Sequence, residues 1–405
     1  MIEHFSQLPP TSAETEIRQR IAINGPMTFV EFMGIALYWP RGGYYATGAS
    51  FGPDGDFYTS PLTHPVFGAL LAWQVEEMWR VAGAPERWWV VEPGAGLGRL
   101  AADLTSAIGE GRLNDALRYL AIDRLYPPFP VTGVSWVQSL GLPVRGLRGV
   151  VLANELLDAM PVHRVTVLDG ALRETFVGVD KEGHFVDVLA SPSPGVAERL
   201  ELLGVTLGEG HRAEVCLGID AWIASVGSAI DSGYLLLIDY GHEANAYYDE
   251  TRFQGLLRTY YKHTLGMDPY SHIGRQDISV HVELTSLRYA TNAAGFVEAG
   301  STTQSDFLRS LGFDRYRDDI ATRTDLSTPV RVANLRALDR LVDPEGMGGF
   351  KVLAFAKGMP IHGLSGFSGV VPEIEATAPT ATTFHMPMGG AMQAAEMPTW
   401  ENLLE

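Results

Sequence analysis

The sequence predicts an α/β fold in which a parallel sheet is covered by helices on both faces. Short leucine-rich or β-branched runs alternate with helical patterns through the middle of the chain, which is typical of βαβ units. The apolar run 88–91 ends in Glu92 and passes directly into three closely spaced glycines. A buried strand that opens into a ligand-binding turn has this pattern. We therefore expect the functional site at the carboxyl edge of the sheet.

The elements of this sheet follow one another in a regular order. The predicted strands are 88–92, 117–123, 134–137, 149–153 and 234–239, with a last strand at 350–356. Helical periodicity predicts helices at 97–108, 218–230, 303–311 and 329–342. This part of the chain, 86–358, is predicted to be the main domain.

Residues 1–85 are predicted to form a helical N-terminal region that contains a loop of the site. Thr28 followed by Glu31 has the spacing of a helix cap, and an apolar stripe follows it. Residues 40–63 are rich in Gly, Tyr, Asp and Pro and predict a loop. A second amphipathic helix is expected at 64–81, because Gly and Pro follow it.

Two insertions interrupt the α/β pattern, at about 162–212 and 243–285. The first begins with alternating residues around Asp169-Gly170, which predicts a hairpin with a type I′ turn. The segment 359–405 contains no Lys or Arg and is expected to be largely disordered. Its end is apolar again and forms either a frayed terminus or a docking peptide for the same or another chain, through Trp400, Leu403 and Leu404.

Composition excludes several classes of protein. The chain has 405 residues, of which 46% are hydrophobic, and a formal net charge of −18. Such a surface repels nucleic acid and anionic membranes. Cys216 is the sole cysteine, so no intramolecular disulfide forms, and no metal-binding cluster stands out. Without a signal-peptide pattern or an apolar run of about 18 residues, we expect a cytoplasmic protein with no metal, no nucleic-acid partner and no membrane insertion.

The glycine cluster carries the first candidate site. Gly94, Gly96 and Gly98 do not fit the dinucleotide pattern G-x-G-x-x-G, because Arg99 stands where its last glycine belongs. The acid before the glycines instead resembles the first motif of class I S-adenosyl-L-methionine (SAM) methyltransferases. Asp123 ends the next strand, where it is either a ligand for ribose hydroxyls or an ordinary strand-end carboxylate.

A second group of candidates follows the strand 149–153. Asn154, Glu155 and Asp158 lie at the same sheet edge, and on a helical turn the two acids share a face. Paired carboxylates suit a cationic acceptor such as a guanidinium, although acids are also common where a helix begins. His281 is either a proton acceptor or a structural histidine.

Several separated stretches, taken together, resemble the MidA-like methyltransferase family, which includes mitochondrial complex I assembly factor 7. The similarity extends over roughly residues 20–358. The matching stretches are 25–33, 42–45, 55–61, 91–96, 153–163, 238–242 and 276–283. In one departure, Pro-Gly-Ala-Gly-Leu-Gly at 93–98 replaces the family's usual Leu-Gly-Pro-Gly-Arg-Gly, so an arginine is lost from the turn.

The resemblance implies a Rossmann-like class I SAM methyltransferase that symmetrically dimethylates arginine in a protein partner, with a role in complex I assembly. It implies that SAM is held by Glu92, Gly94, Gly96, Gly98, Asp123, Asp56, Thr59 and Ser60. It places Asn154, Glu155 and Asp158 beside the acceptor. Three alternatives stay open: a small-molecule or peptide O- or N-methyltransferase, a non-catalytic SAM-binding assembly factor, and a nicotinamide oxidoreductase. A homodimer is also left open.

Overall fold

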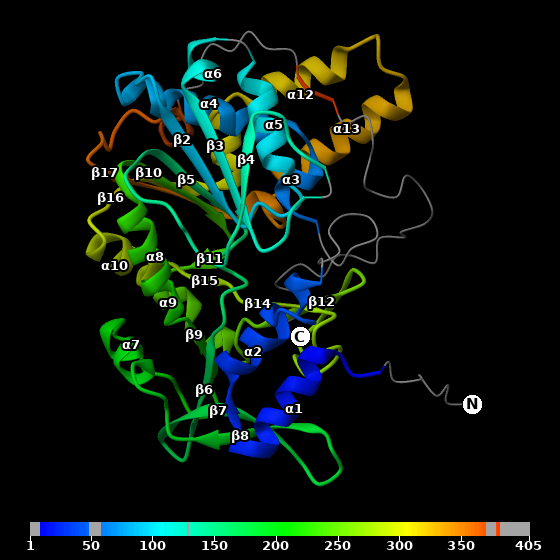
Figure 1. Cartoon of the computed structure of the whole chain (residues 1–405), viewed down its shortest axis with the longest axis vertical. Coiled ribbons are helices and arrows are strands. Elements are labelled where there is room, and N and C mark those ends of the chain that lie inside the picture. Colours follow the sequence, from blue (N-terminus) through cyan, green and yellow to red (C-terminus); the bar gives the residue numbers. More distant parts are fainter. Residues whose placement is uncertain (1–8, 48–57, 110, 128, 370–377, 381–405) are drawn as a thin grey trace.

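The computed structural model describes residues 9–47, 58–109, 111–127, 129–369 and 378–380. Figure 1 shows a large sheet with helices on both faces in the upper part, and smaller sheets beside the N-terminal helices in the lower part. None of the described helices is long and apolar enough to span a membrane.

The large sheet has seven strands in the order β16-β17-β10-β5-β2-β3-β4. Their bounds are β2 (Trp88–Pro93), β3 (Leu117–Asp123), β4 (Val134–Gln138), β5 (Leu147–Asn154), β10 (Ile230–Asp239), β16 (Val297–Thr303) and β17 (Lys351–Lys357). Strands β4, β3, β2, β5 and β10 are parallel, and β17 is antiparallel to both of its neighbours. The predicted α/β fold with a parallel sheet is therefore confirmed.

Strand β16 was not predicted. Its sequence, Val-Glu-Ala-Gly-Ser-Thr-Thr, contains no apolar run, because it is an edge strand whose residues are all partly or fully exposed. A bulge between Glu298 and Gly300 interrupts its pairing with β17.

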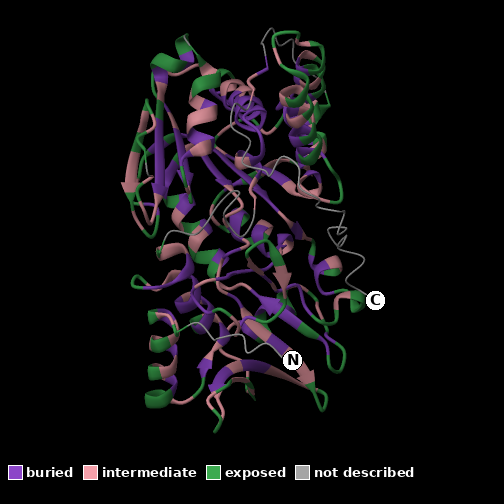
Figure 2. Cartoon of the chain, turned by 90° about the vertical axis from the view of Figure 1, so that its right-hand side faces the viewer, coloured by how far each residue is buried: buried purple, intermediate pink, exposed green. Residues whose placement is uncertain are grey.

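Helices cover the two faces of the large sheet. On one face lie α4 (Val66–Val81), α5 (Arg99–Ile108), α6 (Arg112–Ala116), α11 (Gln304–Ser310), α12 (Phe313–Thr322) and α13 (Thr328–Leu341). On the other face lie α8 (Gly218–Ala229) and α10 (Leu284–Ala293). Val90 packs into the first core and Val91 into the second, as the alternation of a strand requires. Figure 2 shows the buried residues concentrated in these strands and the exposed ones on the outer helix surfaces.

A third core joins the N-terminal region to the first insertion. It contains the small sheet of β1 (Met27–Thr28), β6 (His163–Leu168), β7 (Ala171–Val179), β8 (Phe185–Ala190) and β9 (Arg212–Val215), with α1 (Ser12–Asn24), α2 (Phe29–Tyr38) and α7 (Val196–Leu202). The Thr28 hydroxyl accepts the Glu31 N–H, as its spacing predicted. Asp169 and Gly170 both have positive φ, +53° and +70°, in the predicted hairpin turn.

The remaining elements are short. They are η1 (Tyr44–Ala46), α3 (Ser60–Thr63), β11 (Gly241–His242), α9 (Ala244–Tyr247), η2 (Glu250–Arg252), β12 (Arg258–Tyr261), β13 (Thr264–Gly266), β14 (Asp277–Ser279), β15 (Val282–Glu283), η3 (Met347–Gly349) and α14 (Ser365–Ser368). After Lys357 the chain packs back on α4, where Ser365 N–H donates to Glu77 at 2.7 Å. The terminal Trp400, Leu403 and Leu404 lie outside the described residues.

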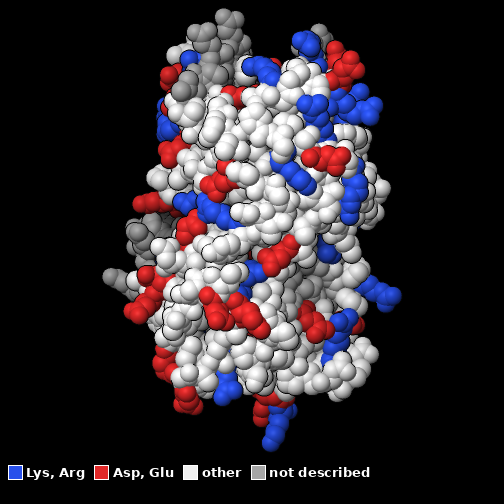
Figure 3. Space-filling view, turned by 90° about the vertical axis from the view of Figure 1, so that its left-hand side faces the viewer, with Lys and Arg blue, Asp and Glu red and all other residues white. Residues whose placement is uncertain are grey.

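Acidic and basic side chains are interspersed on the face shown in Figure 3 rather than gathered into patches of one sign.

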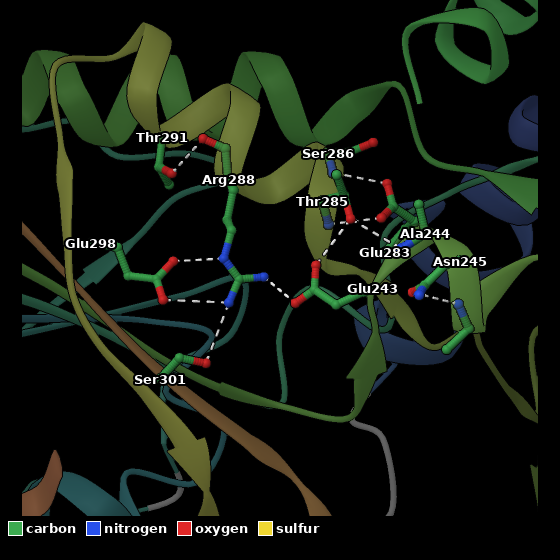
Figure 4. A network of polar contacts seen from close by, with 11 residues as sticks. Glu243, Ala244, Asn245, Glu283, Thr285, Ser286, Arg288, Thr291, Glu298 and Ser301 are labelled. Carbon is green, nitrogen blue, oxygen red and sulfur yellow. Dashed lines mark hydrogen bonds and ion pairs between the residues drawn. The ribbon is translucent and has the colours of Figure 1, made fainter. Parts of the chain in front are cut away.

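The loop after β11 is joined to its neighbours by hydrogen bonds and ion pairs of Arg288 in α10 (Figure 4). Arg288 pairs with Glu243 and, at 2.6 Å, with Glu298 of β16. Thr285 also donates to Glu243 at 3.0 Å. This network fixes the segment that follows the end of β10.

Candidate active site

A cavity of about 780 Å³ lies at the carboxyl ends of β2, β3 and β5. Residues of the N-terminal region, including Tyr38 and Tyr45, also line this cavity. Predicted site residues that line it are Glu92, Gly94, Gly96, Asp123, Asn154, Glu155, Asp158 and Thr59. Ser60 and Gly98 are not among its lining residues, and Asp56 lies outside the described residues.

The turn after β2 contains three glycines, which have no side chain. Gly94, Gly96 and Gly98 all have positive φ, between +54° and +73°, which glycine adopts without strain. A Cβ added at Gly94 would stand 2.7 Å from a methyl group of Leu156. A side chain at Gly94 would therefore require Leu156 to shift and would also be strained at this positive φ.

Two carboxylates flank this turn. Glu92 is 4% exposed and its Oε2 accepts the Tyr119 hydroxyl at 2.7 Å. Burial raises the pKa of Glu92 to about 8. Asp123 Oδ2 accepts the Gly96 N–H at 2.8 Å, and its Oδ1 accepts the N–H of Arg124 at 2.6 Å. The end of β3 is thus tied to the glycine turn of β2.

Glu155 follows β5 in a constrained position. Its φ is +48°, which is uncommon for a residue with a Cβ. Its Oε1 accepts both the Ser60 N–H and an Asn154 side-chain N–H, each at 2.9 Å. Burial raises the pKa of Glu155 to about 8. Ser60, which was expected beside the cofactor, instead positions Glu155.

Hydrogen bonds with Asp239 and Tyr240 fix the position of Asp158. The Tyr240 hydroxyl donates to Asp158 Oδ2 at 2.6 Å, and Asp239 Oδ2 accepts the N–H groups of Leu157 and Asp158. Burial raises the pKa of Asp158 to about 6. Asp158 Oδ1 and Asn154 Oδ1 are buried, and no described residue donates a hydrogen bond to either. Two acceptors in the cavity wall thus lack donors.

Sequence reasoning did not assign a role to the tyrosines of the N-terminal region. Tyr38 and Tyr45 stack at 5.5 Å with an angle of 20° between their rings. The Tyr38 hydroxyl donates to Ala159 O at 2.8 Å, and Tyr45 donates to Asp277 at 2.7 Å. Burial raises the pKa of Asp277 to about 7. The only signal was that Tyr45 ends one stretch of the family resemblance, and chain spacing gives no hint of these contacts.

His281 does not line this cavity. Its ring packs edge-on against Tyr240, with centroids 4.9 Å apart, and stacks on His242 at 5.1 Å. Burial lowers its pKa well below the ordinary value, which favours the neutral ring. Tyr240 thus packs between His281 and Asp158, whereas the sequence left open a role for His281 as a proton acceptor in the site.

Comparison with known proteins places this geometry in a family. A family model of S-adenosyl-L-methionine-dependent methyltransferases matches residues 70–302. A crystal structure of a Burkholderia thailandensis protein bound to S-adenosyl-homocysteine superposes with a TM-score of 0.79. The two chains are 31% identical, and the match covers 88% of this chain and 94% of that one.

Relatives from animals match over similar lengths. The protein named "Protein arginine methyltransferase NDUFAF7, mitochondrial" from Danio rerio is 27% identical, over 82% of this chain and 83% of its own. The protein of the same name from Homo sapiens is 26% identical, over 84% and 82%. Because the family model covers more than half of the chain and the Burkholderia thailandensis structure is 31% identical over 88% of it, this chain belongs to the family of class I S-adenosyl-L-methionine-dependent methyltransferases.

Proposed function

We propose that this enzyme methylates the guanidinium group of an arginine in a protein substrate. One observation carries the proposal: Asn154 Oδ1 and Asp158 Oδ1 are buried in the cavity wall beside Glu155 and receive no hydrogen bond from a described residue. A guanidinium carries several N–H donors and a positive charge, and it supplies what these acceptors lack. The names of the animal relatives agree with this substrate.

The residues present fit SAM. The positive-φ turn leaves main chain facing the cavity at Gly94 and Gly96, with Gly98 completing the bend. We assign Glu92 to the amino-acid end of the cofactor and Asp123 to its ribose hydroxyls. Thr59 lines the opposite wall, and we keep Asp56 as part of the loop that closes over it. SAM, when bound, supplies a methyl group activated by the neighbouring sulfonium.

The chain itself orients the acceptor and receives a proton. In our proposal Glu155 and Asp158 hold the guanidinium with one nitrogen toward the methyl donor, and Tyr38 and Tyr45 exclude water. Replacing an N–H by N–CH₃ releases one proton. We assign that proton to Asp158, because its pKa of about 6 leaves it ionised at neutral pH. His281 is not needed as the acceptor.

The test is transfer of label from SAM to protein. Purified enzyme is incubated with labelled SAM and lysate from a strain that lacks it, and mass spectrometry then locates the label. We expect methylarginine in a protein, and loss of the label with Asp158→Asn but not with Glu182→Gln, an exposed carboxylate elsewhere. Label on a small molecule would support the alternative methyltransferase. Binding of SAM without any labelling would support the non-catalytic assembly factor.

Finer features of the function stay predictions. Symmetric dimethylation and a role in complex I assembly are implied by the family resemblance alone. A homodimer and a cytoplasmic location are likewise predictions, and the animal relatives are named as mitochondrial. Amino-acid analysis of the labelled product would separate symmetric from asymmetric dimethylarginine.

A further inference from the structure

The cavity holds an unusual distribution of charge. Four carboxylates line it, and among the described residues only two cations do, Arg99 and Arg124. Arg99 pairs with Asp103 at 3.1 Å. Arg124 forms no ion pair with any carboxylate that the structure describes, although it lies in the field of the neighbouring Asp123. One positive charge in the cavity wall is therefore not neutralised by a direct partner.

The Arg124 side chain is held in a defined position. One of its terminal nitrogens donates to the Tyr38 carbonyl at 2.9 Å, and its guanidinium carbon stands 4.2 Å from the centre of the Tyr38 ring. Its own main-chain carbonyl accepts a hydrogen bond from Gln138 at 2.6 Å. Stacking on a ring fixes the plane of a guanidinium. No described residue accepts from its remaining N–H groups.

The position of Tyr38 locates this cation in the site. Tyr38 is bound by Arg124, which follows β3, and its hydroxyl reaches Ala159, which follows β5. In the sheet, β2 lies between β3 and β5. Tyr38 therefore spans the end of β2, and the guanidinium stacked on it lines the same cavity as Gly94 and Gly96.

We propose that Arg124 binds the α-carboxylate of the cofactor's amino-acid moiety. SAM carries only one anionic group, and Arg124 is the cation of the described cavity wall that has no ion-pair partner. A guanidinium that is pre-oriented by stacking and partly removed from water forms strong paired hydrogen bonds with a carboxylate. The glycine turn lines the same cavity, and in this proposal its main chain and Arg124 together hold the amino-acid moiety. Arg124 thus selects ligands that retain the carboxylate.

The test compares two ligands that differ in this carboxylate alone. Calorimetry measures the affinity of the full chain for S-adenosyl-homocysteine and for its decarboxylated analogue, with no methyl acceptor present. We expect Arg124→Met to weaken S-adenosyl-homocysteine by about 10- to 100-fold. The same substitution should change the affinity for the decarboxylated analogue by less than about threefold. The result does not depend on whether arginine is the acceptor, so it can fail independently of the proposed function.

Matched variants complete the test. Arg99→Met removes a cavity cation that already has a partner, and it should change both affinities little. Arg124→Lys keeps the charge but loses the planar pair of donors, and an intermediate loss is expected for S-adenosyl-homocysteine only. Arg124→Lys is the milder change, so it replaces Arg124→Met in the test if circular dichroism shows that the Met variant is unfolded. If Arg124→Met or Arg124→Lys weakened the affinity for both ligands equally, the proposal would be overturned and Arg124 would only support Tyr38.

Discussion

The main-chain N–H of Ser60 donates a 2.9 Å hydrogen bond to Glu155 Oε1, which joins two residues that are 95 positions apart. The same oxygen accepts from Asn154, so two donors orient one carboxylate whose backbone has positive φ. Glu155 Oε2 is left to face other partners. This arrangement makes the N-terminal region part of the site and leads directly to a first prediction.

Glu155→Gln is expected to remove turnover while leaving cofactor affinity nearly unchanged. Gln keeps the oxygen that accepts the Ser60 N–H, but it cannot take the negative charge that a bound guanidinium favours on Glu155. We expect kcat to fall by about 100-fold or more and the Kd for S-adenosyl-homocysteine to stay within about threefold. Steady-state kinetics and calorimetry measure the two quantities, with Glu182→Gln as control. A parallel loss of both would show that Glu155 serves the cofactor instead.

Gly94→Val is expected to abolish cofactor binding. The new Cβ would approach Leu156 to 2.7 Å, and valine is strained at the φ of +72°. We expect the affinity for S-adenosyl-homocysteine to fall by about 100-fold, because the side chain fills the space that the ligand needs. Gly204→Val is the matched control: its φ is +66°, but a Cβ there meets nothing within 4 Å. Both variants should lose about 1–2 kcal/mol of stability, and unimpaired binding by Gly94→Val would contradict the assignment of the turn.

The pH dependence of activity should report Asp158. We expect kcat/KM to rise with pH in two steps, around about 6 for Asp158 and about 8 for Glu155, because only ionised carboxylates hold a guanidinium and Asp158 must also accept a proton. The Tyr240 hydroxyl donates to Asp158 Oδ2 and thereby lowers the pKa of Asp158. Tyr240→Phe removes this hydroxyl. The midpoint of the lower step should therefore move up by about one unit. Tyr289→Phe, at a half-exposed tyrosine on α10, should leave it in place. A midpoint that Tyr240→Phe does not move would exclude Asp158 as the titrating group.

The ligand-free enzyme should be more stable near pH 5 than near pH 8. The pKa of Glu155 is about 8 when folded and has its ordinary value of 4.5 when unfolded. Between these values the folded chain binds more protons than the unfolded chain, so the free energy of unfolding falls as the pH rises. Glu155→Gln removes this group. The difference in Tm between pH 5 and pH 8 should shrink by about 2–5 °C in the variant, and differential scanning calorimetry without ligand checks it. An unchanged difference would contradict the raised pKa.

The regular part of the fold could be predicted because local patterns specify it. The inner parallel strands β2, β3, β5 and β10 have apolar runs, since both faces of the sheet are buried there. The Thr28 cap and the Asp169-Gly170 turn depend on residues close in the chain. Strand β16 escaped prediction because an edge strand needs no such run. The helix α12 was also missed, since most of its surface is polar.

In the candidate site, too, some features follow from the sequence alone and others only from the tertiary structure. Sequence alone determined where the sheet opens into a glycine turn, that two acids follow β5, and which family the chain resembles, because each is written in neighbouring residues. Only the tertiary structure decided that Ser60 bonds to Glu155, that His281 packs behind Tyr240, and that Arg124 stacks on Tyr38. These contacts join residues from separate elements. Such pairs form only when packing of the N-terminal region and the insertions against the sheet edge brings them together, so no local pattern in the chain encodes them.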